Sequence, residues 1–352
     1  GLPSRLIKLN TLNMADANMR ELIEKFPAQL KDATTHLSKM DDGGHKKAAQ
    51  DFTPSSVLII GMGGSGIGGA IVEGLLSQSS KMPILSCADY SIPGWVCEST
   101  LVIACSYSGN TEETIEAVTI ASDRKAQICV VTSGGALTEM AEENNWPIVT
   151  MPGGNPPRSQ FGRGFTGLAW TLKQFGVFAE EMYSDLESSS EFLNTMVETI
   201  VEQAGALADI VEDKIIMIYS DTAAGPIATR MRQQLNENSK LLVNTHVLPE
   251  MNHNELVGWD SGSSDHVAII IRTPEDNTRS RFRMDFCSDI FRELEADVIM
   301  IDAIGENQMH RLMYLNQLSD WLSLLLAERS GTCPVDIKNI IRLKSALESF
   351  NG

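Results

Sequence analysis

The segment SVLIIGMGGSGIGGA, residues 56–70, decides how this chain folds. Four apolar residues in a row, Val57 to Ile60, lead into a loop rich in glycine at 61–69, and a helical stretch, Ala70 to Leu76, follows. Unbroken hydrophobicity is typical of a parallel strand that is covered on both faces. A strand, a glycine-rich turn and a helix in this order predict the first unit of a doubly wound α/β sheet.

The same alternation of apolar runs and helical stretches continues along the chain. Further strands are expected at 84–87, 101–104, 128–131 and 148–150, and, after a helix over 186–209, at 214–219, 241–243, 267–272 and 297–302. Helices are expected at 223–235, 279–294 and 308–330, and Pro334 is expected to open a last helix. We therefore divide the chain into an N-terminal helical segment (1–50), a first α/β domain (51–185) and a second one with C-terminal helices (186–352).

Composition limits the kinds of partner. Of the 352 residues, 43% are hydrophobic and 21% are charged, the mix of a soluble globular protein, and no apolar run reaches membrane-spanning length. The formal net charge of -18 disfavours nucleic acid and anionic membrane surfaces as partners. The cysteines lack metal-ligand spacing and the N-terminus lacks a secretory-signal pattern, so we expect a cytoplasmic protein with reduced thiols.

The glycine-rich loop fits three hypotheses. Backbone amides without side chains at a helix start can bind a phosphate. Gly61, Gly63 and Gly66 also satisfy the dinucleotide fingerprint, with Asp89 near the end of the next strand as the residue for the ribose. Alternatively, the glycines only permit a tight turn and close helix packing. The loop by itself does not separate the three.

A second loop, Ser106 to Thr111, favours the phosphate. Ser106, Ser108 and Thr111 place three hydroxyls just before a helix that opens with two glutamates. These hydroxyls and the free amides of a helix start can donate to phosphate oxygens, so an acidic protein could hold the anion without lysine. Helix capping by Thr111 or Ser108 explains one hydroxyl but not three. Neither loop has the glycine-lysine-serine/threonine ending of a P-loop.

Three further segments carry groups suited to catalysis. Arg158 follows two prolines just past an expected strand, Glu237 lies at the end of an expected helix, and His253 lies in a polar loop. A carboxylate and an imidazole can carry protons, and an arginine can stabilise negative charge. Each of these residue types is also common on a solvated surface.

Metal binding is the competing hypothesis for the polar loop. The candidate ligands are His246, Glu250, His253 and Glu255. Their spacing matches no standard motif, and both histidines would have to turn inward. We therefore expect neither a metal ion nor another cofactor.

Four motifs in order resemble those of the bifunctional phosphoglucose/phosphomannose isomerase family. They are the serine/threonine loop, Pro157-Arg158, Asn236-Glu237-Asn238 and Asn252-His253-Asn254-Glu255, and the resemblance covers nearly the whole chain. It implies two doubly wound parallel-sheet SIS (sugar isomerase, flavodoxin-like) domains flanked by helices. Gly64, Ser65, Ser106, Ser108 and Thr111 match the family's phosphate-binding positions.

The same resemblance implies roles for the remaining residues. Arg158 matches the arginine beside the reacting carbons, and Glu237 matches the base that moves a proton between C1 and C2. His253 matches the ring-opening residue, which in the family enters from the neighbouring subunit of a dimer. A lysine near the C-terminus completes the family site, with Lys344 as our choice and Lys338 as the second candidate.

The implied activity is aldose-ketose isomerisation of glucose 6-phosphate, and of mannose 6-phosphate, to fructose 6-phosphate through an enediolate. The reaction moves a proton and takes no electrons from the sugar, so it needs no redox cofactor. Two alternatives stay open. A non-catalytic SIS-domain sensor would need the phosphate loop but not Glu237, His253 and a late lysine together, and an NAD-binding oxidoreductase would have to bind a nicotinamide cofactor.

Overall fold

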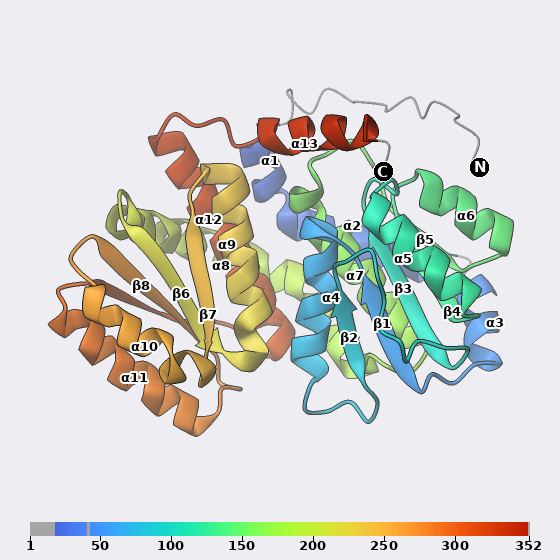
Figure 1. Ribbon diagram of the computed structural model, residues 1–352, viewed down its shortest axis with the longest axis horizontal. Helices are drawn as coiled ribbons and strands as arrows, with labels where there is room; N and C mark the ends of the chain where they lie inside the picture. Colours follow the sequence, from blue (N-terminus) through green and yellow to red (C-terminus); the bar gives the residue numbers. More distant parts are fainter. Residues whose placement is uncertain (1–17, 41–42, 351–352) are drawn as a thin grey trace.

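The computed structural model describes residues 18–40 and 43–350, and two parallel sheets dominate it (Figure 1). In this part of the chain the first sheet has five strands in the order β2-β1-β3-β4-β5. They are β1 (Ser56–Ile60), β2 (Ile84–Cys87), β3 (Thr100–Ser106), β4 (Gln127–Thr132) and β5 (Ile148–Thr150). This order is that of a flavodoxin-like sheet and differs from the usual order of a dinucleotide-binding fold.

Helices cover both faces of the first sheet. They are α4 (Gly63–Leu76), α5 (Glu112–Asp123), α6 (Ala136–Asn144) and α7 (Phe161–Gln174). Successive side chains of β1 point to opposite faces, so Val57 and Ile59 share a cluster with α4 and α7, whereas Leu58 and Ile60 share one with α5 and α6. Burial on both faces explains why the sequence of β1 is apolar throughout.

The second sheet repeats the pattern. Over the described residues its order is β7-β6-β8-β9, with β6 (Ile215–Asp221), β7 (Val243–Leu248), β8 (His266–Arg272) and β9 (Asp297–Asp302). One face packs against α9 (Gly225–Ser239) and α12 (Gln308–Arg329), with α8 (Glu180–Val211) behind α12. The other face is covered by α11 (Thr278–Glu293) and the short α10 (Glu255–Gly258). The doubly wound α/β fold expected from the sequence is confirmed.

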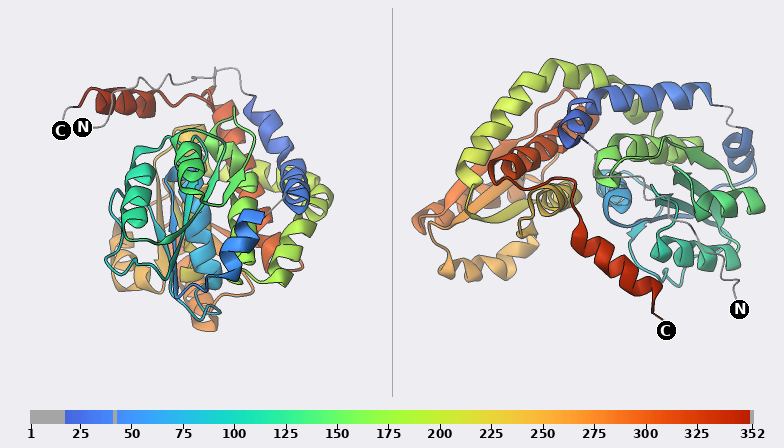
Figure 2. Two further views of the ribbon diagram at one scale, coloured as in Figure 1. Left: turned by 90° about the vertical axis from the view of Figure 1, so that its right-hand side faces the viewer. Right: turned by 90° about the horizontal axis from the view of Figure 1, so that it is seen from above.

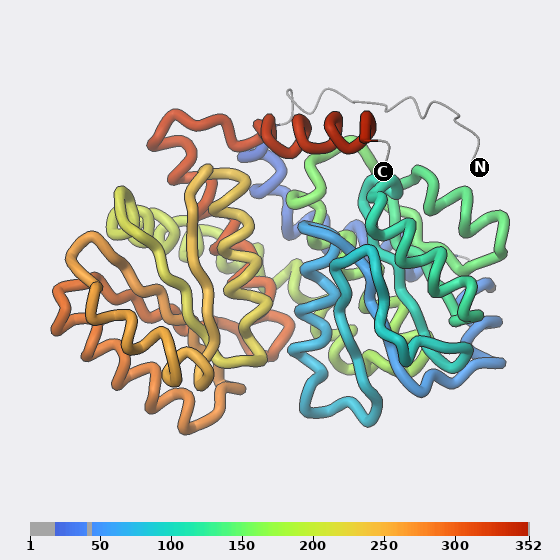
Figure 3. Tube along the Cα trace, in the orientation of Figure 1, coloured from blue at the N-terminus to red at the C-terminus, as the bar shows by residue number. Residues whose placement is uncertain are grey.

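The inner helices join the two halves. The tube in Figure 3 shows α4 and α9 side by side between the sheets, and one continuous hydrophobic cluster runs from Ile59 and Ile71 to Ile218 and Met231. The N-terminal helices are α1 (Met19–Glu24), α2 (Phe26–Lys39) and α3 (Gly43–Gln50). Helix α2 packs against α7 and α8. The rest of the predicted helical segment, 1–17 and 41–42, lies outside the described residues. No helix in the described ranges is long and apolar enough to cross a membrane.

Two sequence-based boundaries are wrong. The strand expected at 241–243 is β7 at 243–248, because α9 continues to Ser239 and Leu242 is 97% exposed. β7 is an edge strand, so it lacks the continuous apolar run that marks a central strand. Pro334 does not open the last helix either, since α13 (Lys338–Glu348) begins four residues later. The backbone at Pro334 is held instead by a hydrogen bond from Arg158.

Helix α13 stands apart from the body of the molecule, as both views in Figure 2 show. All of its side chains are exposed, including the apolar Ile340, Ile341, Leu343 and Leu347. Helix α8 is also longer than expected, and the proposed domain boundary at residue 186 lies inside it.

Candidate functional site

The serine/threonine loop connects the carboxyl end of β3 to α5, and its hydroxyls bond within the loop. Ser106 Oγ lies 2.9 Å from Thr111 Oγ1 and accepts from the Gly109 amide over 3.1 Å. Thr111 occupies the N-cap position of α5, yet its side chain makes no capping hydrogen bond. Capping therefore does not explain the hydroxyls, and the amides of the first turn of α5 are left for a ligand.

Backbone geometry keeps this loop in place. Gly109 has φ +68°, and a side chain there would meet the Gly134 carbonyl at 1.7 Å. Asn110 Oδ1 accepts from the Ala136 amide at the start of α6 over 2.9 Å. The loop is thus attached to the next βα turn, so its hydroxyl positions are fixed before any ligand arrives.

The glycine-rich loop after β1 packs tightly against its surroundings. A side chain at Gly66 would lie 2.2 Å from the Gly61 carbonyl oxygen, and one at Gly64 would lie 3.1 Å from the Arg158 Cα. Asp89, the residue expected for a ribose, accepts instead from the amide of Tyr90 and the hydroxyl of Ser91 in its own turn. The close-packing hypothesis therefore explains Gly61 and Gly66, and Gly64 lets α4 approach the arginine segment.

Arg158 joins the two halves of the protein. It lies in the short 3-10 helix η2 (Pro157–Gln160), and its side chain is 2% exposed. Nε donates to Asn238 Oδ1 over 2.7 Å, Nη1 donates to Glu237 Oε2 over 3.1 Å, and Nη2 donates to the Pro334 carbonyl. Burial lowers the pKa of Arg158, against the charge of Glu237, but a guanidinium starts so high that it stays protonated near neutral pH.

Glu237 is partly exposed, with 28% of its side chain accessible, whereas Asn238 is fully buried. Its carboxylate can therefore reach a ligand while Arg158 and the buried Asn238 hold its position from behind. Three of the five guanidinium N–H donors bond to the protein, and because the group is planar these bonds also fix the directions of the other two. The site combines a carboxylate for proton transfer with a cation for developing negative charge.

Lys240 fixes the end of α9 behind Glu237. It takes the left-handed conformation at φ +59°, and its Nζ donates to the Glu237 carbonyl over 2.7 Å and to the Cys333 carbonyl over 2.6 Å. Burial, together with the charge of Arg158, lowers the pKa of Lys240. The sequence-based prediction missed this lysine, whose only local signal is its place just after a helix that ends in Asn-Ser.

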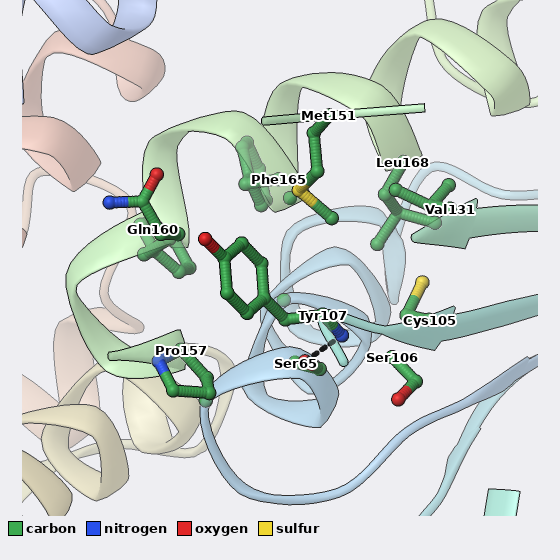
Figure 4. A pocket seen from close by; sticks show the side chains of 14 residues that line it. Ser65, Cys105, Ser106, Tyr107, Val131, Met151, Pro157, Gln160, Phe165 and Leu168 are labelled. Carbon is green, nitrogen blue, oxygen red and sulfur yellow. Dashed lines mark hydrogen bonds between the residues drawn. The ribbon is translucent and has the colours of Figure 1, made fainter. Parts of the chain in front are cut away.

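Tyr107 connects the serine/threonine loop with the segment that carries Arg158. Its amide donates to Ser65 Oγ over 3.0 Å, and its hydroxyl donates to the Pro152 carbonyl and accepts from the Asn155 amide, both over 3.1 Å. Figure 4 shows Tyr107 beside a small cavity of about 20 Å³. A cavity of that size holds about one water molecule, so a sugar has to bind outside it.

The structure brings Arg158, Glu237, Gly64 and the loop 106–111 to one region but leaves two predicted residues elsewhere. His253 is exposed in the 3-10 helix η4 (Glu250–His253), which follows β7, whereas Glu237 precedes β7. The strand between them spans roughly 20 Å at about 3.3 Å per residue. Lys344 and Lys338 are exposed on α13, and Lys338 pairs with Asp336 over 2.9 Å.

The candidate metal ligands do not converge. His246 Nδ1 and Glu255 Oε2 lie 2.8 Å apart, and the Tyr219 hydroxyl also donates to Glu255. Glu250 accepts from the Asn254 side chain over 3.0 Å instead. In the described ranges, no three histidine, cysteine or acidic residues are grouped as metal ligands would be.

Comparison with known proteins gives consistent matches. Residues 200–347 match the family model described as the bacterial phospho-glucose isomerase C-terminal SIS domain. The bifunctional phosphoglucose/phosphomannose isomerase of Aquifex aeolicus is 34% identical over 85% of this chain and 93% of its own length. The protein of the same name from Caldicellulosiruptor bescii is 33% identical over 83% and 89%.

A solved structure extends the likeness to the fold. The C-terminal domain of glucosamine-fructose-6-phosphate aminotransferase from Francisella tularensis aligns with a TM-score of 0.74, covering 92% of this chain and 99% of that one. The two sequences are only 13% identical. This likeness therefore concerns the arrangement of the two sheets and their helices alone.

Proposed function

The chain belongs to the bifunctional phosphoglucose/phosphomannose isomerase family, and we propose that it interconverts glucose 6-phosphate and mannose 6-phosphate with fructose 6-phosphate. The observation that carries this proposal is the contact of Arg158 Nη1 with Glu237 Oε2 over 3.1 Å, and the helix start of α5, where Thr111 makes no capping bond, supports it as the place for the phosphate. An isomerase needs a base over two carbons and a cation over their oxygens, at a fixed distance from the phosphate. A sensor would need the anion site alone.

The phosphate is held by Ser106, Ser108, Thr111 and the first amides of α5, with Gly64 and Ser65 at the start of α4. Binding energy at this end of the sugar places C1 and C2 at Glu237. Glu237 takes the proton from C2 of the open aldose and returns it to C1, and Arg158 stabilises the enediolate that forms between the two steps. The hydroxyl proton of O2 also has to pass to O1, where the former carbonyl becomes a hydroxyl. Both protons stay with the substrate and the groups that carry them, so the reaction is balanced without an oxidant.

Opening of the sugar ring is the role that we propose for His253 and for Lys344. Both can move a proton between the ring oxygen and the neighbouring hydroxyl. Lys344 lies on α13, which begins four residues after Pro334. The carbonyls of Cys333 and Pro334 bond to Lys240 and Arg158, so this chain segment starts at the site. Its role stays a prediction, as does that of Lys338, and so does the cytoplasmic location expected from the sequence.

One assay separates this function from its alternatives. Purified protein is given glucose 6-phosphate or mannose 6-phosphate, and fructose 6-phosphate is measured directly, without added nicotinamide cofactor. Turnover of both sugars is expected. A protein that binds the sugars without turning them over would be a sensor, and activity that requires a nicotinamide cofactor would identify an oxidoreductase; either result would overturn the proposal.

Removing one hydroxyl from the anion site is expected to weaken substrate binding. In Thr111→Val the side chain keeps its shape but can no longer donate to a phosphate oxygen, and a hydrogen bond to a charged group contributes about 1.5–3 kcal/mol. We expect KM for both hexose phosphates to rise roughly tenfold or more. The matched control is Thr119→Val on the same helix, whose exposed hydroxyl bonds to the Ile115 carbonyl. Equal KM values for the two variants would show that Thr111 does not bind the phosphate.

A second copy of the chain supplies His253 in our proposal. His253 lies on the face formed by η4, α10 and α11. It follows the carboxyl end of β7, whereas Glu237 precedes the amino end of that strand. A groove of about 660 Å³ lies on this face, lined by the exposed Phe282 and Phe286 and by Arg279 and Arg283.

The groove is connected to the loop that carries His253. Arg283 donates to Asn252, the residue before His253, over 3.2 Å. Exposed aromatic and arginine side chains beside one another are typical of protein interfaces, and the arginines suit the surface of a chain with a net charge of -18.

A further inference from the structure

A buried row of polar side chains lies between α9 and α12, directly behind Arg158. Arg230, Gln234 and Asn238 follow one another at intervals of four residues on α9, so they share one face of that helix. The facing residues of α12 are Asn316, Asp320 and Ser323. All six residues are at most 3% exposed, and we call this group the polar seam.

Arg230 is the charged centre of the seam. Its Nε donates to Asn316 Oδ1, and its Nη2 donates to Asp320 Oδ1 over 3.2 Å. Asp320 Oδ1 also accepts from Gln234 Nε2 over 2.7 Å. Arg230 Cζ lies 4.4 Å from the centre of the Phe161 ring. A buried ion pair of this kind is seldom kept for stability alone, because both charges lose their hydration.

The seam reaches the site through the backbone. Arg230 Nη2 also donates to the carbonyl oxygen of Arg158 over 3.2 Å, and Phe161, under the Arg230 guanidinium, begins the helix that follows η2. One side chain of the second half therefore holds the main chain that presents Arg158. At the other end of the seam, Asn238 accepts from Arg158 Nε and donates to Ser323 Oγ.

We propose that Arg230 and Asp320 are positioning residues, which hold the Arg158 guanidinium at the reacting carbons by fixing η2 against α9 and α12. The inference rests on the proposed isomerase function. The hydrogen bonds of the serine/threonine loop go to Ser65, to the start of α6 and, through Tyr107, to Pro152 and Asn155, and not to the six seam residues. Loss of the ion pair should therefore disturb the chemical step more than the binding of substrate.

The ionisation of Asp320 makes the ion pair depend on pH. Burial raises the pKa of Asp320 to about 6, against the charge of Arg230 and the hydrogen bonds from Gln234 and Asn316. The other charged groups that bear on the pair are Glu237 of α9, which raises the pKa of Arg230, and Arg158 of η2. The carboxyl of Asp320 is ionised at pH 8 and gains a proton as the pH falls through 6, so acid weakens the ion pair.

The test is the steady-state kinetics of Asp320→Asn in the full-length protein. At pH 8 we expect kcat to fall on the order of tenfold to a hundredfold, because a small displacement of a catalytic group has that effect, while KM changes less than about twofold. The ratio of wild-type to variant kcat should shrink between pH 8 and pH 5, since the wild-type carboxyl becomes protonated there. Taking the ratio removes every pH dependence that the two proteins share.

The control is Ser319→Ala, the neighbouring buried position on α12, whose hydroxyl bonds only within its helix to Leu315. It should lose stability without losing kcat. If Asp320→Asn does not melt cooperatively, Arg230→Lys replaces it, because lysine keeps the charge but lacks the planar fork that bonds several acceptors at once. A folded variant with near-normal kcat, or one with a raised KM and unchanged kcat, overturns the proposal. An inactive wild-type protein would instead contradict the isomerase function itself.

Discussion

Glu237→Gln is expected to lower kcat by a factor of a hundred to ten thousand, roughly the contribution of a positioned general base. Glutamine keeps the size of the side chain and a carbonyl oxygen for Arg158 Nη1, which now bonds to Glu237 Oε2 over 3.1 Å. The buried arginine therefore retains an acceptor, so the variant should fold. The amide cannot accept the C2 proton, and KM should change little because the phosphate loop is untouched. Exchange of the C2 hydrogen with deuterated water, followed by NMR, should disappear together with turnover.

A matched control separates loss of the base from loss of a negative charge. Glu293 lies at the end of α11, as Glu237 lies near the end of α9, and its side chain is exposed. Glu293→Gln removes the same charge from a comparable helix end in a different part of the molecule and should leave kcat unchanged. Should folded Glu237→Gln turn over at nearly the wild-type rate, another group would have to be the base.

The sequence places the central strands and the edge strands β2, β5 and β9, but it misplaces the edge strand β7. Val57 to Ile60 could be assigned because a strand buried on both faces must be apolar at every position. β7 is an edge strand with Asn244 and Thr245 in its middle, so its pattern does not distinguish it from a loop. The start of α13 could not be predicted either, because a hydrogen bond from Arg158, 176 residues earlier in the chain, holds Pro334.

The candidate site shows the same division between local and long-range information. The hydroxyls of Ser106 and Thr111 lie five residues apart, so their common position at a helix start follows from the sequence. The contact between Arg158 and Glu237 joins residues 79 apart, and only the family resemblance implied that both residues act at the same carbons. Nothing in the sequence predicted that Arg230 is buried, because a charged residue on a helix is expected to face solvent. Arg230 is paired in its buried position with Asp320, which lies 90 residues later in the chain.

In the second sheet, carboxylates bond to the donors at the strand ends, so we expect each chain to bind one phosphate and not two. At the end of β6, Asp221 accepts from the amides of Thr222 and Asn277 over 2.8 Å and from the Ser280 hydroxyl over 3.1 Å. Asp276 accepts from the Thr273 amide over 2.8 Å. These donors lie where parallel strands end and helices begin, as they do in the first sheet. Here the protein's own carboxylates occupy them, so a bound phosphate would meet negative charge.

A mixed dimer of two inactive variants is expected to be active if His253 completes the site of a neighbouring subunit. His253→Ala and Glu237→Gln are each expected to be strongly impaired as pure dimers. In a dimer with one chain of each kind, the site built on the His253→Ala chain has its own Glu237 and receives an intact His253 from its partner. The other site lacks both groups. Coexpression with two different affinity tags isolates this mixed dimer, which should show about half of the wild-type activity.

The geometry makes this result specific to a shared site. Within one chain, Glu237 precedes β7 and His253 follows it. The strand between them is roughly 20 Å long, too far for both residues to act on one sugar ring. A control dimer of Glu237→Gln with a chain that carries both substitutions has no complete site and should stay inactive. If the mixed dimer were as inactive as its parents while each chain remained folded, His253 would not act across the interface. An active wild-type monomer in size-exclusion chromatography with light scattering would contradict the shared site as well, because no partner could then supply His253.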